Sequence, residues 1–402
     1  MKNKPELLCP AGSFPSLIAA VENGADAVYL GLQEFSMRAL AHNFKLSDLK
    51  KVREICNTRG LNKRKVKIYL TLNTIIYDNE IKKIENIIKK VKKDKLADAI
   101  ICWDLSVIEL SKKYKIPFHI STQASIANSE SAKFYEKLGA ERAVLARELN
   151  ISQIKQISKT IKTEVFIHGA MCVSVSGRCF TSQFLFNKSA NRGECLQPCR
   201  RAYTIRDEDN NELVLENNKV MSPKDLCVLP FIEKLKKAGI TAFKIEGRNR
   251  SPEYVSVVTR VYRKALDKSL TKEEIKESLE ELKKVYNRGF SSGFYLGMPT
   301  SDDFSSSETG EQKESKKLVG RIEKYWPKAH AVSLKMLAGS LSVGNEIYII
   351  GKQTGIKKMK VESLEFDNKP TKEAKKGQEV GMKLHFEAKK GDEVYIIIRK
   401  PK

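Results

Sequence analysis

Residues 66–102 read VKIYLTLNTIIYDNEIKKIENIIKKVKKDKLADAIIC, in which two short apolar runs flank a stretch with a helical pattern. Apolar runs that alternate with helical patterns are typical of parallel strands covered by helices on both faces. The alternation extends over roughly the first 250 residues, where we expect eight strands at 6–9, 26–30, 66–72, 98–102, 118–121, 143–146, 164–169 and 241–247. Eight such units predict an α/β fold of the TIM-type (β/α)8 barrel class.

A doubly wound open sheet is the alternative arrangement of the same elements. The glycine fingerprint GxGxxG follows none of the expected strands, which weakens a dinucleotide-binding interpretation. We therefore expect residues 1–300 to form a barrel-like catalytic domain. A Cys-rich insertion over 170–240 separates the seventh strand from the eighth, and residues 222–239 within it have a helical pattern. An insertion after a barrel strand lies at the carboxyl-terminal face, where such barrels do their chemistry.

The remainder of the chain has a different pattern. After helices expected at 251–267 and 271–289, residues 301–317 are rich in serine and charge, which indicates a linker. From 318 to 402, β-rich runs broken by glycines predict a small β-barrel. This part carries 18 Lys and Arg against 10 Asp and Glu, which suits a domain that contacts an RNA backbone. A solvated Lys-rich surface explains the excess almost as well.

The whole chain is strongly basic, with 73 Lys and Arg against 49 Asp and Glu and a net charge of +24. Such a charge favours a nucleic acid as partner, although a Lys-rich proteome has the same effect. The N-terminal segment MKNKPELLCPAG lacks the apolar run of a signal peptide, and no apolar run is long enough to span a membrane. We therefore expect a cytoplasmic protein without a membrane partner, in which disulfides are rare.

Cysteines are concentrated in one short part of the chain. Four of the eight lie within residues 164–200, namely Cys172, Cys179, Cys195 and Cys199, and Cys227 follows as a fifth candidate. Clustered thiols in a cytosolic chain are more often metal ligands or redox groups than disulfides. The wide first spacing, C-x6-C, is closer to how iron–sulfur clusters collect thiolates than to zinc sites with tight pairs. Cys56 and Cys102, by contrast, are expected to be small buried apolar residues.

The segment EVFIHGAMCVSVSGRC (164–179) resembles the signature of the collagenase-like peptidase family of unknown catalytic type, peptidase family U. That pattern is Glu-x-Phe-x-x-Gly-small-aliphatic-Cys-x4-Gly-x-Cys-x-aliphatic-Ser, and only Thr181 departs from it. Residues 7–31, 193–203, 222–227 and 243–255 also look like the family, so the resemblance covers roughly residues 5–300. The C-terminal part is similar to a β-barrel that some members carry.

The resemblance implies two rival activities. One is proteolysis, including collagen breakdown, by an unassigned mechanism. The other is oxygen-independent hydroxylation, because the family includes proteins that take part in forming 5-hydroxyuridine at the tRNA wobble position, in hydroxylating a ribosomal RNA cytidine and in hydroxylating ubiquinone. Prephenate is implied as the hydroxyl source of the RNA-acting members. The resemblance also implies a [4Fe–4S] cluster on Cys172, Cys179, Cys195 and a fourth cysteine, for which we favour Cys227 over Cys199 because SPKDLC matches a fourth-ligand motif.

Polar residues at the expected strand ends supply the catalytic candidates. His119 and His168 suit proton transfer near neutral pH, Glu246 suits a base or an orienting group, and Arg248 suits a bidentate clamp on a carboxylate such as prephenate. The wider ring contains Asn73, Asp104, Gln123, Arg147 and Glu148, and Arg38 is a weaker anion-binding candidate. Each has a structural alternative, since a strand histidine is often a hydrogen-bonded core residue and Arg147–Glu148 suits a surface ion pair.

Hydroxylation at C5 of the tRNA wobble uridine is the functional hypothesis that uses most of these features. A peptidase is the alternative, although neither HExxH nor GxSxG occurs and only the two strand histidines with Glu246 offer a metal-binding set. A non-catalytic RNA-binding accessory protein is the second alternative, since some relatives work as heterodimers. A homo- or hetero-oligomer is compatible with each hypothesis.

Overall fold

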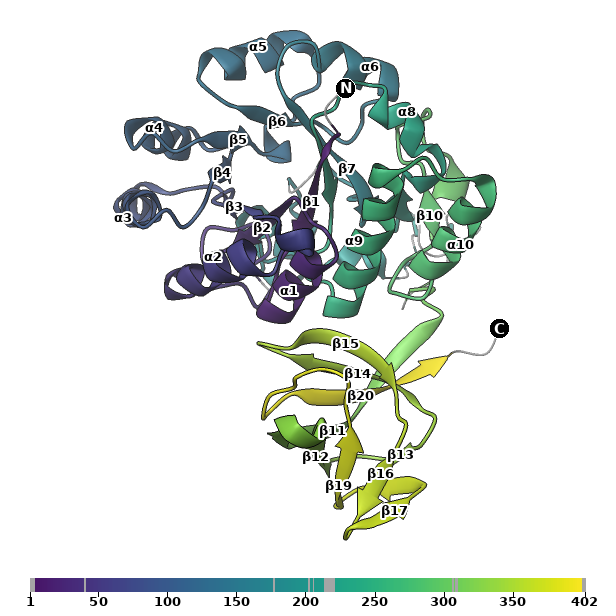
Figure 1. Ribbon diagram of the computed structural model, residues 1–402. Coiled ribbons are helices and arrows are strands. Elements are labelled where there is room, and N and C mark those ends of the chain that lie inside the picture. Colours follow the sequence, from purple (N-terminus) through teal and green to yellow (C-terminus); the bar gives the residue numbers. More distant parts are fainter. Residues whose placement is uncertain are drawn as a thin grey trace.

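The computed structural model describes residues 4–39, 41–175, 178–201, 203–204, 206–212, 221–305, 307 and 310–399. A parallel β-barrel ringed by helices forms the larger part, and a C-terminal antiparallel sheet region lies below it in Figure 1. Within the described residues, no helix is both long and apolar enough to cross a membrane.

The eight strands that the sequence predicts close into one barrel. They are β1 (Glu6–Pro10), β2 (Ala27–Gly31), β3 (Lys67–Thr71), β4 (Ala99–Cys102), β5 (Phe118–Ile120), β6 (Arg142–Val144), β7 (Thr163–Gly169) and β9 (Ala242–Ile245). Neighbouring strands pair in parallel, and β9 pairs with both β7 and β1, which closes the ring. The TIM-type barrel prediction is therefore confirmed.

Helices cover the outside of the barrel, because each has an apolar face to bury. They are α1 (Phe14–Glu22), α2 (Leu49–Thr58), α3 (Ile81–Lys93), α4 (Leu105–Lys113), α5 (Ser129–Lys137), α6 (Ile151–Ile157), α8 (Ile232–Lys236), α9 (Pro252–Asp267) and α10 (Lys272–Leu282). In α3, the buried side chains Ile84, Ile87, Ile88 and Val91 follow helical spacing. Side-chain caps begin several helices, as where Asn128 accepts a hydrogen bond from the Ser131 amide of α5.

The expected helix at 222–239 is wrong over its first half. Residues Asp225–Cys227 form a short strand, β8, which pairs antiparallel with the end of β7, and β10 (Phe290–Ser291) adds to its other edge. The amide of Val228 donates to the Ile167 carbonyl at 3.1 Å, so β7 supplies backbone partners that a helix would have found within itself. Pro230 then disfavours a helical conformation for the residue before it, and α8 begins only at Ile232.

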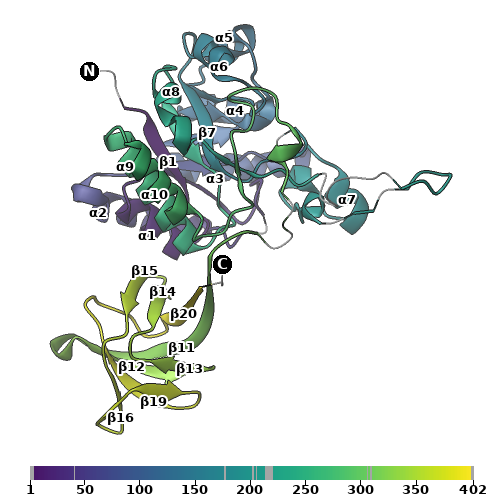
Figure 2. The same cartoon turned by 90° about the vertical axis from the view of Figure 1, so that its right-hand side faces the viewer.

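The Cys-rich insertion has little regular structure. Its one α-helix of the described part, α7 (Thr181–Phe186), extends beyond the barrel on the right of Figure 2. Arg192 holds the insertion to the barrel through a bidentate ion pair with Glu80, at 2.9 Å for Nη1 and 2.5 Å for Nη2. The amide of Ala39 also donates to the Gly193 carbonyl at 3.0 Å. The insertion therefore lies against the connections that follow β2 and β3.

The C-terminal region is an antiparallel sheet around its own apolar core. Its strands are β11 (Glu314–Trp326), β12 (Ala331–Met336), β13 (Ser340–Ser342), β14 (Glu346–Gly351), β15 (Gly355–Lys360), β16 (Leu364–Phe366), β17 (Lys369–Thr371), β18 (Glu373–Lys375), β19 (Glu379–Lys383) and β20 (Glu393–Arg399). Eight of them form one sheet in the order β15-β14-β20-β11-β12-β19-β16-β17, and β13 pairs with β18. The core includes Val319, Ile322, Leu334, Ile349 and Val380.

The segment expected as a linker, 301–317, is partly regular structure. Strand β11 begins at Glu314 and pairs with β20 from that residue onward. The last four residues of the expected linker, 314–317, are therefore part of a strand. Exposed and half-buried side chains alternate there, but all four are polar, so the sequence shows no apolar alternation that would indicate a strand. Earlier in the segment, the amide of Ser305 donates to the Ser222 carbonyl at 2.7 Å. The C-terminal sheet contacts α1 directly, since Lys357 Nζ lies 2.8 Å from Glu22 Oε2.

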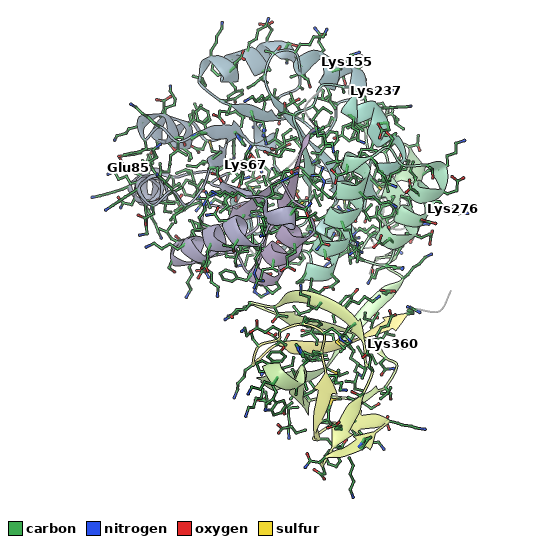
Figure 3. The ribbon with its side chains drawn as sticks, in the orientation of Figure 1. Lys67, Glu85, Lys155, Lys237, Lys276 and Lys360 are labelled. Carbon is green, nitrogen blue, oxygen red and sulfur yellow. The ribbon has the colours of Figure 1, made fainter. Side chains whose placement is uncertain are left out.

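Positive charge is spread widely over the molecule. Lys155, Lys237, Lys276 and Lys360 lie at separate places on the surface in Figure 3, on or beside α6, α8, α10 and β15. Many lysines have acidic neighbours, as where Lys113 Nζ lies 2.9 Å from Glu85 Oε1. Net charge therefore does not by itself locate a partner's binding surface.

Candidate functional site

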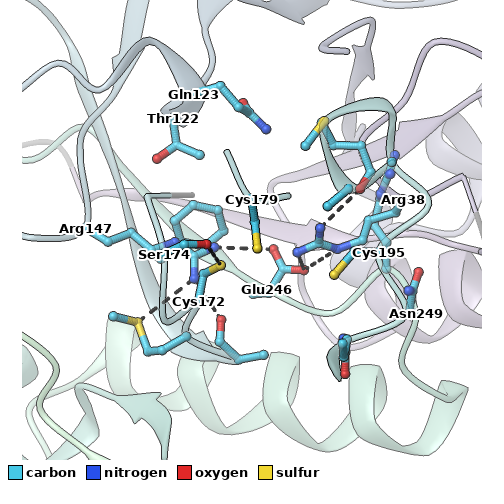
Figure 4. A pocket seen from close by; sticks show the side chains of 18 of the residues that line it. Arg38, Thr122, Gln123, Arg147, Cys172, Ser174, Cys179, Cys195, Glu246 and Asn249 are labelled. Atoms are coloured by element: carbon cyan, nitrogen blue, oxygen red, sulfur yellow. Dashed lines mark hydrogen bonds and ion pairs between the residues drawn. The ribbon is translucent and has the colours of Figure 1, made fainter. Parts of the chain in front are cut away.

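A pocket opens at the carboxyl ends of the barrel strands, between the barrel and the Cys-rich insertion (Figure 4). Strands β2, β3, β7 and β9 and the connections after β2, β3, β5, β6 and β9 supply its barrel wall. The side chains of that wall are Tyr29, Arg38, Thr71, Asn73, Ser121, Thr122, Gln123, Arg147, Phe166, Lys244, Glu246, Arg248 and Asn249. This is the face at which the fold places catalysis in other barrels.

Glu246 is the acidic side chain of this wall, and arginines surround it. Arg38 donates from Nε at 3.3 Å and from Nη2 at 3.1 Å to Oε1, and Arg147 Nη2 lies 3.7 Å from Oε2. Burial alone would raise the pKa of the Glu246 carboxyl, but the guanidinium groups of Arg38, Arg147 and Arg248 bring it below its usual value. The carboxylate is therefore ionised at neutral pH.

Backbone geometry at the end of β7 brings Glu246 into place. Gly169 has φ of +104°, and a Cβ there would lie 2.6 Å from the Glu246 carbonyl oxygen and 2.9 Å from Tyr254 Oη. Only glycine adopts this conformation without strain and leaves room for β9 so close by. Tyr254 Oη in turn donates to the Glu246 carbonyl at 2.9 Å. The two strand ends that flank the insertion are thus locked together.

Arg248 is buried, and the barrel holds its guanidinium group by one nitrogen. Nη1 donates to Ser36 Oγ at 2.6 Å and to Thr71 Oγ1 at 2.8 Å. Burial lowers the pKa of Arg248 to about 10, which still leaves it charged at neutral pH. The hydroxyl groups fix the plane of the guanidinium, which suits recognition of a planar anion.

A buried ionic layer supports the pocket from below. Lys244 lines the pocket and donates to Glu164 Oε1 at 2.8 Å, while Arg142 Nη1 lies 3.2 Å from Glu164 Oε2 and 2.8 Å from Glu6 Oε1. Burial alone would raise the pKa of Glu164, but Lys244 and Arg142 bring it below its usual value. The layer closes the barrel beneath the pocket with charged groups that are paired.

Four thiols line the opposite wall of the same pocket. They are Cys172, Cys179, Cys195 and Cys199, and three of them are labelled around Glu246 in Figure 4. Cys172 is exposed, and its Sγ lies 3.3 Å from Ser174 Oγ. Burial alone would raise the pKa of the Cys179 thiol, but hydrogen bonding with Thr181, whose Oγ1 lies 3.3 Å from Cys179 Sγ, lowers it. Burial raises the pKa of Cys199.

Cys227 does not join these four thiols. Its Sγ is buried in β8, 3.6 Å from Tyr262 Oη, and it lines a second cavity beside Phe231 and Phe290. Burial raises the pKa of this thiol to about 11. The structure thus brings Cys199 rather than the preferred Cys227 to the pocket of Cys172, Cys179 and Cys195. The reason is that β8 pairs with β7 and turns Cys227 toward α9 instead of toward the insertion.

The residues of this wall fit an iron–sulfur cluster in kind. Four cysteine thiols on one wall are the donor set that a [4Fe–4S] cluster uses. Among the described residues, however, no three His, Cys, Asp or Glu side chains lie close enough together to hold a metal ion as they stand. A [4Fe–4S] cluster is a larger group that takes one thiolate at each iron, and Cys172, Cys179, Cys195 and Cys199 are the thiols that would hold it.

Neither candidate histidine lies in the pocket, so the expectation that both face the barrel mouth is wrong. His119 is inside the barrel near its opposite end, where its ring meets Tyr69 edge-on at 4.7 Å. Burial, aided by nearby Arg142, lowers its pKa. His168 points outward beneath α9, with Nδ1 3.3 Å from Tyr262 Oη, and burial lowers its pKa to about 3. Alternation along a strand shows which residues share a face but not which of the two faces points into the barrel. The sequence alone therefore could not place these histidines.

Of the wider ring, Asn73, Gln123 and Arg147 line the pocket, whereas Asp104 and Glu148 do not. Asp104 caps α4 by accepting from the Ser106 amide at 3.0 Å. Arg147 makes no surface ion pair with its neighbour. It donates to the Ala170 carbonyl at 2.7 Å and its guanidinium carbon lies 3.8 Å from the centre of the Phe166 ring.

The sequence underrated Arg38 and missed Lys244 and Tyr29. Arg38 lies in an irregular connection, where no periodicity marks it, yet it is the nearest cation to Glu246. Lys244 and Tyr29 lie within strands that are otherwise apolar, so they were interpreted as core residues. In the structure, Lys244 Nζ lies 4.5 Å from the centre of the Tyr29 ring. A lysine in a strand that is otherwise apolar is the signal that could have found it.

The described site lies within the span that matches a known family. The model of the family described as Peptidase family U32 matches residues 12–305, and the chain belongs to this family. The expected family resemblance is therefore confirmed.

Relatives of this chain carry names of two kinds. The chain is 39% identical over 412 residues to the collagenase of Porphyromonas gingivalis strain W83, across 98% of each chain. It is 37% identical to tRNA hydroxylation protein P1 of Bacillus subtilis, over 66% of this chain and 63% of that protein. It is 39% identical to the 23S rRNA 5-hydroxycytidine C2501 synthase of Escherichia coli, over 65% of this chain and 39% of that protein. Similar proteins are thus named both for peptide hydrolysis and for RNA hydroxylation.

Proposed function

We propose that this chain is an iron–sulfur enzyme of the cytoplasm that hydroxylates RNA without oxygen, at C5 of the tRNA wobble uridine. One observation carries the proposal. A cationic pocket, with Arg38, Arg147 and Arg248 around the carboxylate of Glu246, opens directly onto four cysteine thiols. The names of the Bacillus subtilis and Escherichia coli relatives support RNA as the substrate class.

The charge of the pocket favours an anionic co-substrate. Arg38, Arg147, Arg200 and Arg248 line it together with Lys244, while Glu246 is the acidic group of the barrel wall and Glu164 lies beneath it. The excess of cations suits a small molecule with carboxylate groups, and prephenate is the co-substrate that the family resemblance suggests. In this proposal Arg248, already oriented by Ser36 and Thr71, binds one carboxylate. Glu246 accepts or relays a proton beside it.

The thiols would hold the cofactor. Cys172, Cys179, Cys195 and Cys199 are the residues we assign to a [4Fe–4S] cluster, because they share one wall of the pocket. A bound cluster would supply electron transfer or Lewis-acid polarisation of a substrate oxygen. Cys227 is an alternative fourth ligand only if β8 leaves its place against β7. We assign no direct catalytic role to His119 or His168, which lie outside the pocket.

The RNA substrate is larger than the pocket, so most of its contacts lie elsewhere. The C-terminal sheet region, with its excess of Lys and Arg, is the part that we assign to the sugar–phosphate backbone. Its contacts with α1 fix it to the same body as the barrel, as the Lys357–Glu22 pair shows.

Peptide hydrolysis is the second candidate, and one observation favours it. The collagenase of Porphyromonas gingivalis matches this chain over nearly its whole length, including the C-terminal region. Digestion of gelatin or casein by anaerobically purified protein tests this candidate. Proteolysis that disappears in Glu246→Gln and persists in Glu148→Gln would place a peptidase in the same pocket. In the described residues, however, no histidine lines that pocket.

Mass spectrometry of tRNA nucleosides tests the proposal. We expect cells that lack the gene to lose 5-hydroxyuridine derivatives, and a plasmid copy of the gene to restore them. Wild-type levels of these nucleosides in the deletion strain would overturn the tRNA assignment. Ribosomal RNA from the same cells shows whether a hydroxycytidine is lost instead.

A further inference from the structure

The rim of the pocket carries exposed aromatic side chains. Phe184 is 88% exposed and Phe180 is 75% exposed, although phenylalanine normally buries most of its surface. Phe184 lies in α7, and Phe180 is the residue that precedes this helix. The Phe184 amide donates to the Phe180 carbonyl at 2.8 Å. Residues four apart lie on the same helix face, so the two rings occupy one side of α7.

This aromatic face is continuous with the pocket. Cys179 and Thr181, on either side of Phe180, both line the pocket, and so does Val173, which is 43% exposed. Helix α7 lies beyond the barrel in Figure 2. The segment that carries Phe180 therefore forms part of the pocket rim.

Cations accompany the aromatic rings. Residues 170–201 contain five Lys and Arg and a single acidic residue, Glu194. Arg178 is exposed, donates to the Gln123 carbonyl at 2.7 Å and lies 5.3 Å from the centre of the Trp103 ring. Arg201 is exposed 5.0 Å from the centre of the Phe186 ring. Aromatic faces beside arginines are how proteins bind unpaired nucleotides, since bases stack on the rings and phosphates meet the cations.

We propose that Phe180 and Phe184 form a stacking platform for unpaired nucleotides of the RNA substrate, next to the base that enters the pocket. Arg178 and Arg201 contact the phosphates of the same segment. The inference rests on the proposed function, because it takes RNA as the substrate and places its unpaired segment. A modified base in a loop must leave its stack to reach a pocket, and a platform at the rim replaces the stacking that its neighbours lose.

The charge of this surface favours RNA over a protein partner or a second copy of the chain. The molecule has a net charge of +24, so a second copy meets electrostatic repulsion at a face that is itself cationic. Interfaces with proteins also tend to exclude charge from their centre, whereas here Arg178 is two residues from Phe180 and Arg201 lies against Phe186 of α7.

Binding of an anticodon stem–loop RNA to the full-length, anaerobically purified protein tests the platform. Fluorescence anisotropy measures the affinity of wild type, Phe184→Ala and Phe180→Ala/Phe184→Ala. We expect the double variant to bind at least about 10-fold more weakly, since each stacked base contributes that order of affinity. Phe134→Ala is the matched control, because Phe134 is 58% exposed on α5 and does not line the pocket.

Two further substitutions separate stacking from general apolar contact. Phe184→Tyr keeps an aromatic face and is expected to bind RNA as wild type does, whereas Phe184→Leu keeps an apolar side chain and is expected to bind like Phe184→Ala. Arg178→Gln and Arg201→Gln are expected to reduce the salt dependence of binding, which the phenylalanine variants leave unchanged.

Three outcomes would overturn the platform. They are unchanged affinity in the double variant, full affinity in Phe184→Leu, and a change of molecular mass in solution in the phenylalanine variants, which would mark a protein interface. The proposed function fails separately, if deletion of the gene leaves the hydroxylated nucleosides in place. Weaker binding in the variants together with unchanged nucleosides would keep the platform and remove the hydroxylation.

Discussion

Arg38 and Glu246 meet at the mouth of the barrel, where the guanidinium Nη2 lies 3.1 Å from the carboxylate Oε1. Arg38 follows β2 and Glu246 follows β9, so the pair connects two strands that flank β1. The carboxylate is 12% exposed and Arg147 lies on its other side. An ionised acid held between two cations, and open to a pocket, is arranged for chemistry on an anionic substrate rather than for stability.

Replacing that acid tests its role. We expect Glu246→Gln to lower 5-hydroxyuridine in tRNA by about 10²-fold or more, because the amide keeps the shape but neither takes a proton nor balances Arg38. The measurement is nucleoside mass spectrometry in a deletion strain that carries the variant. Glu148→Gln, an exposed position outside the pocket, is the control and is expected to restore the nucleoside fully. Full modification in Glu246→Gln would remove Glu246 from the chemistry.

The identity of the fourth cluster ligand is a second test. We expect Cys199→Ala to lose bound iron and the broad visible absorption of a cluster after anaerobic reconstitution, because Cys199 lies in the pocket with the other three thiols. Cys227→Ala is expected to retain both, since Cys227 is buried against Tyr262. Iron analysis and absorbance are read alongside thermal unfolding, which identifies a variant that has merely misfolded. Iron lost from Cys227→Ala and kept in Cys199→Ala would restore the assignment made from the SPKDLC motif.

Sequence patterns located the strands of the barrel well because parallel strands buried on both faces are apolar throughout. They located β8 poorly, since a strand of three residues has no periodicity and depends on the end of β7 for its hydrogen bonds. The same dependence explains Cys227, whose environment is set by Tyr262 on α9 rather than by its own neighbours.

The site itself was only partly predictable. Glu246, Arg248, Asn73 and Gln123 were found because they end strands, where a barrel places its functional residues. His119 and His168 are also on strands, but one lies near the opposite end of the barrel and the other faces α9. Whether a strand residue points into the barrel or toward the helices depends on the pairing register between strands. That register is set when the barrel closes, and the sequence of one strand does not determine it.

The ionic layer beneath the pocket leads to a prediction about stability. Glu164 is fully buried and accepts from both Lys244 and Arg142. We expect Glu164→Gln to lower the free energy of unfolding by about 3–5 kcal/mol, because it leaves the buried Lys244 without a carboxylate and Arg142 with Glu6 alone. Urea unfolding followed by circular dichroism measures the change. Glu130→Gln removes one member of a surface pair with Lys133 and is expected to leave the unfolding midpoint unchanged. If Glu164→Gln unfolds at the same urea concentration as wild type, Glu164 is not an ionised partner of Lys244 and Arg142.

His168 leads to a prediction about pH. Burial lowers its pKa from 6.5 to about 3, so between these values the unfolded chain binds a proton that the folded chain does not. Stability from this residue is therefore present above about pH 6.5 and is lost as the pH falls, by about 1 kcal/mol between pH 7 and 5.5. We expect His168→Gln, whatever its stability at pH 7, to lose about 1 kcal/mol less than wild type over that interval in urea unfolding. His385→Gln, at an exposed histidine, serves as the control. If His168→Gln and wild type show the same pH dependence, the histidine is not buried in its neutral form.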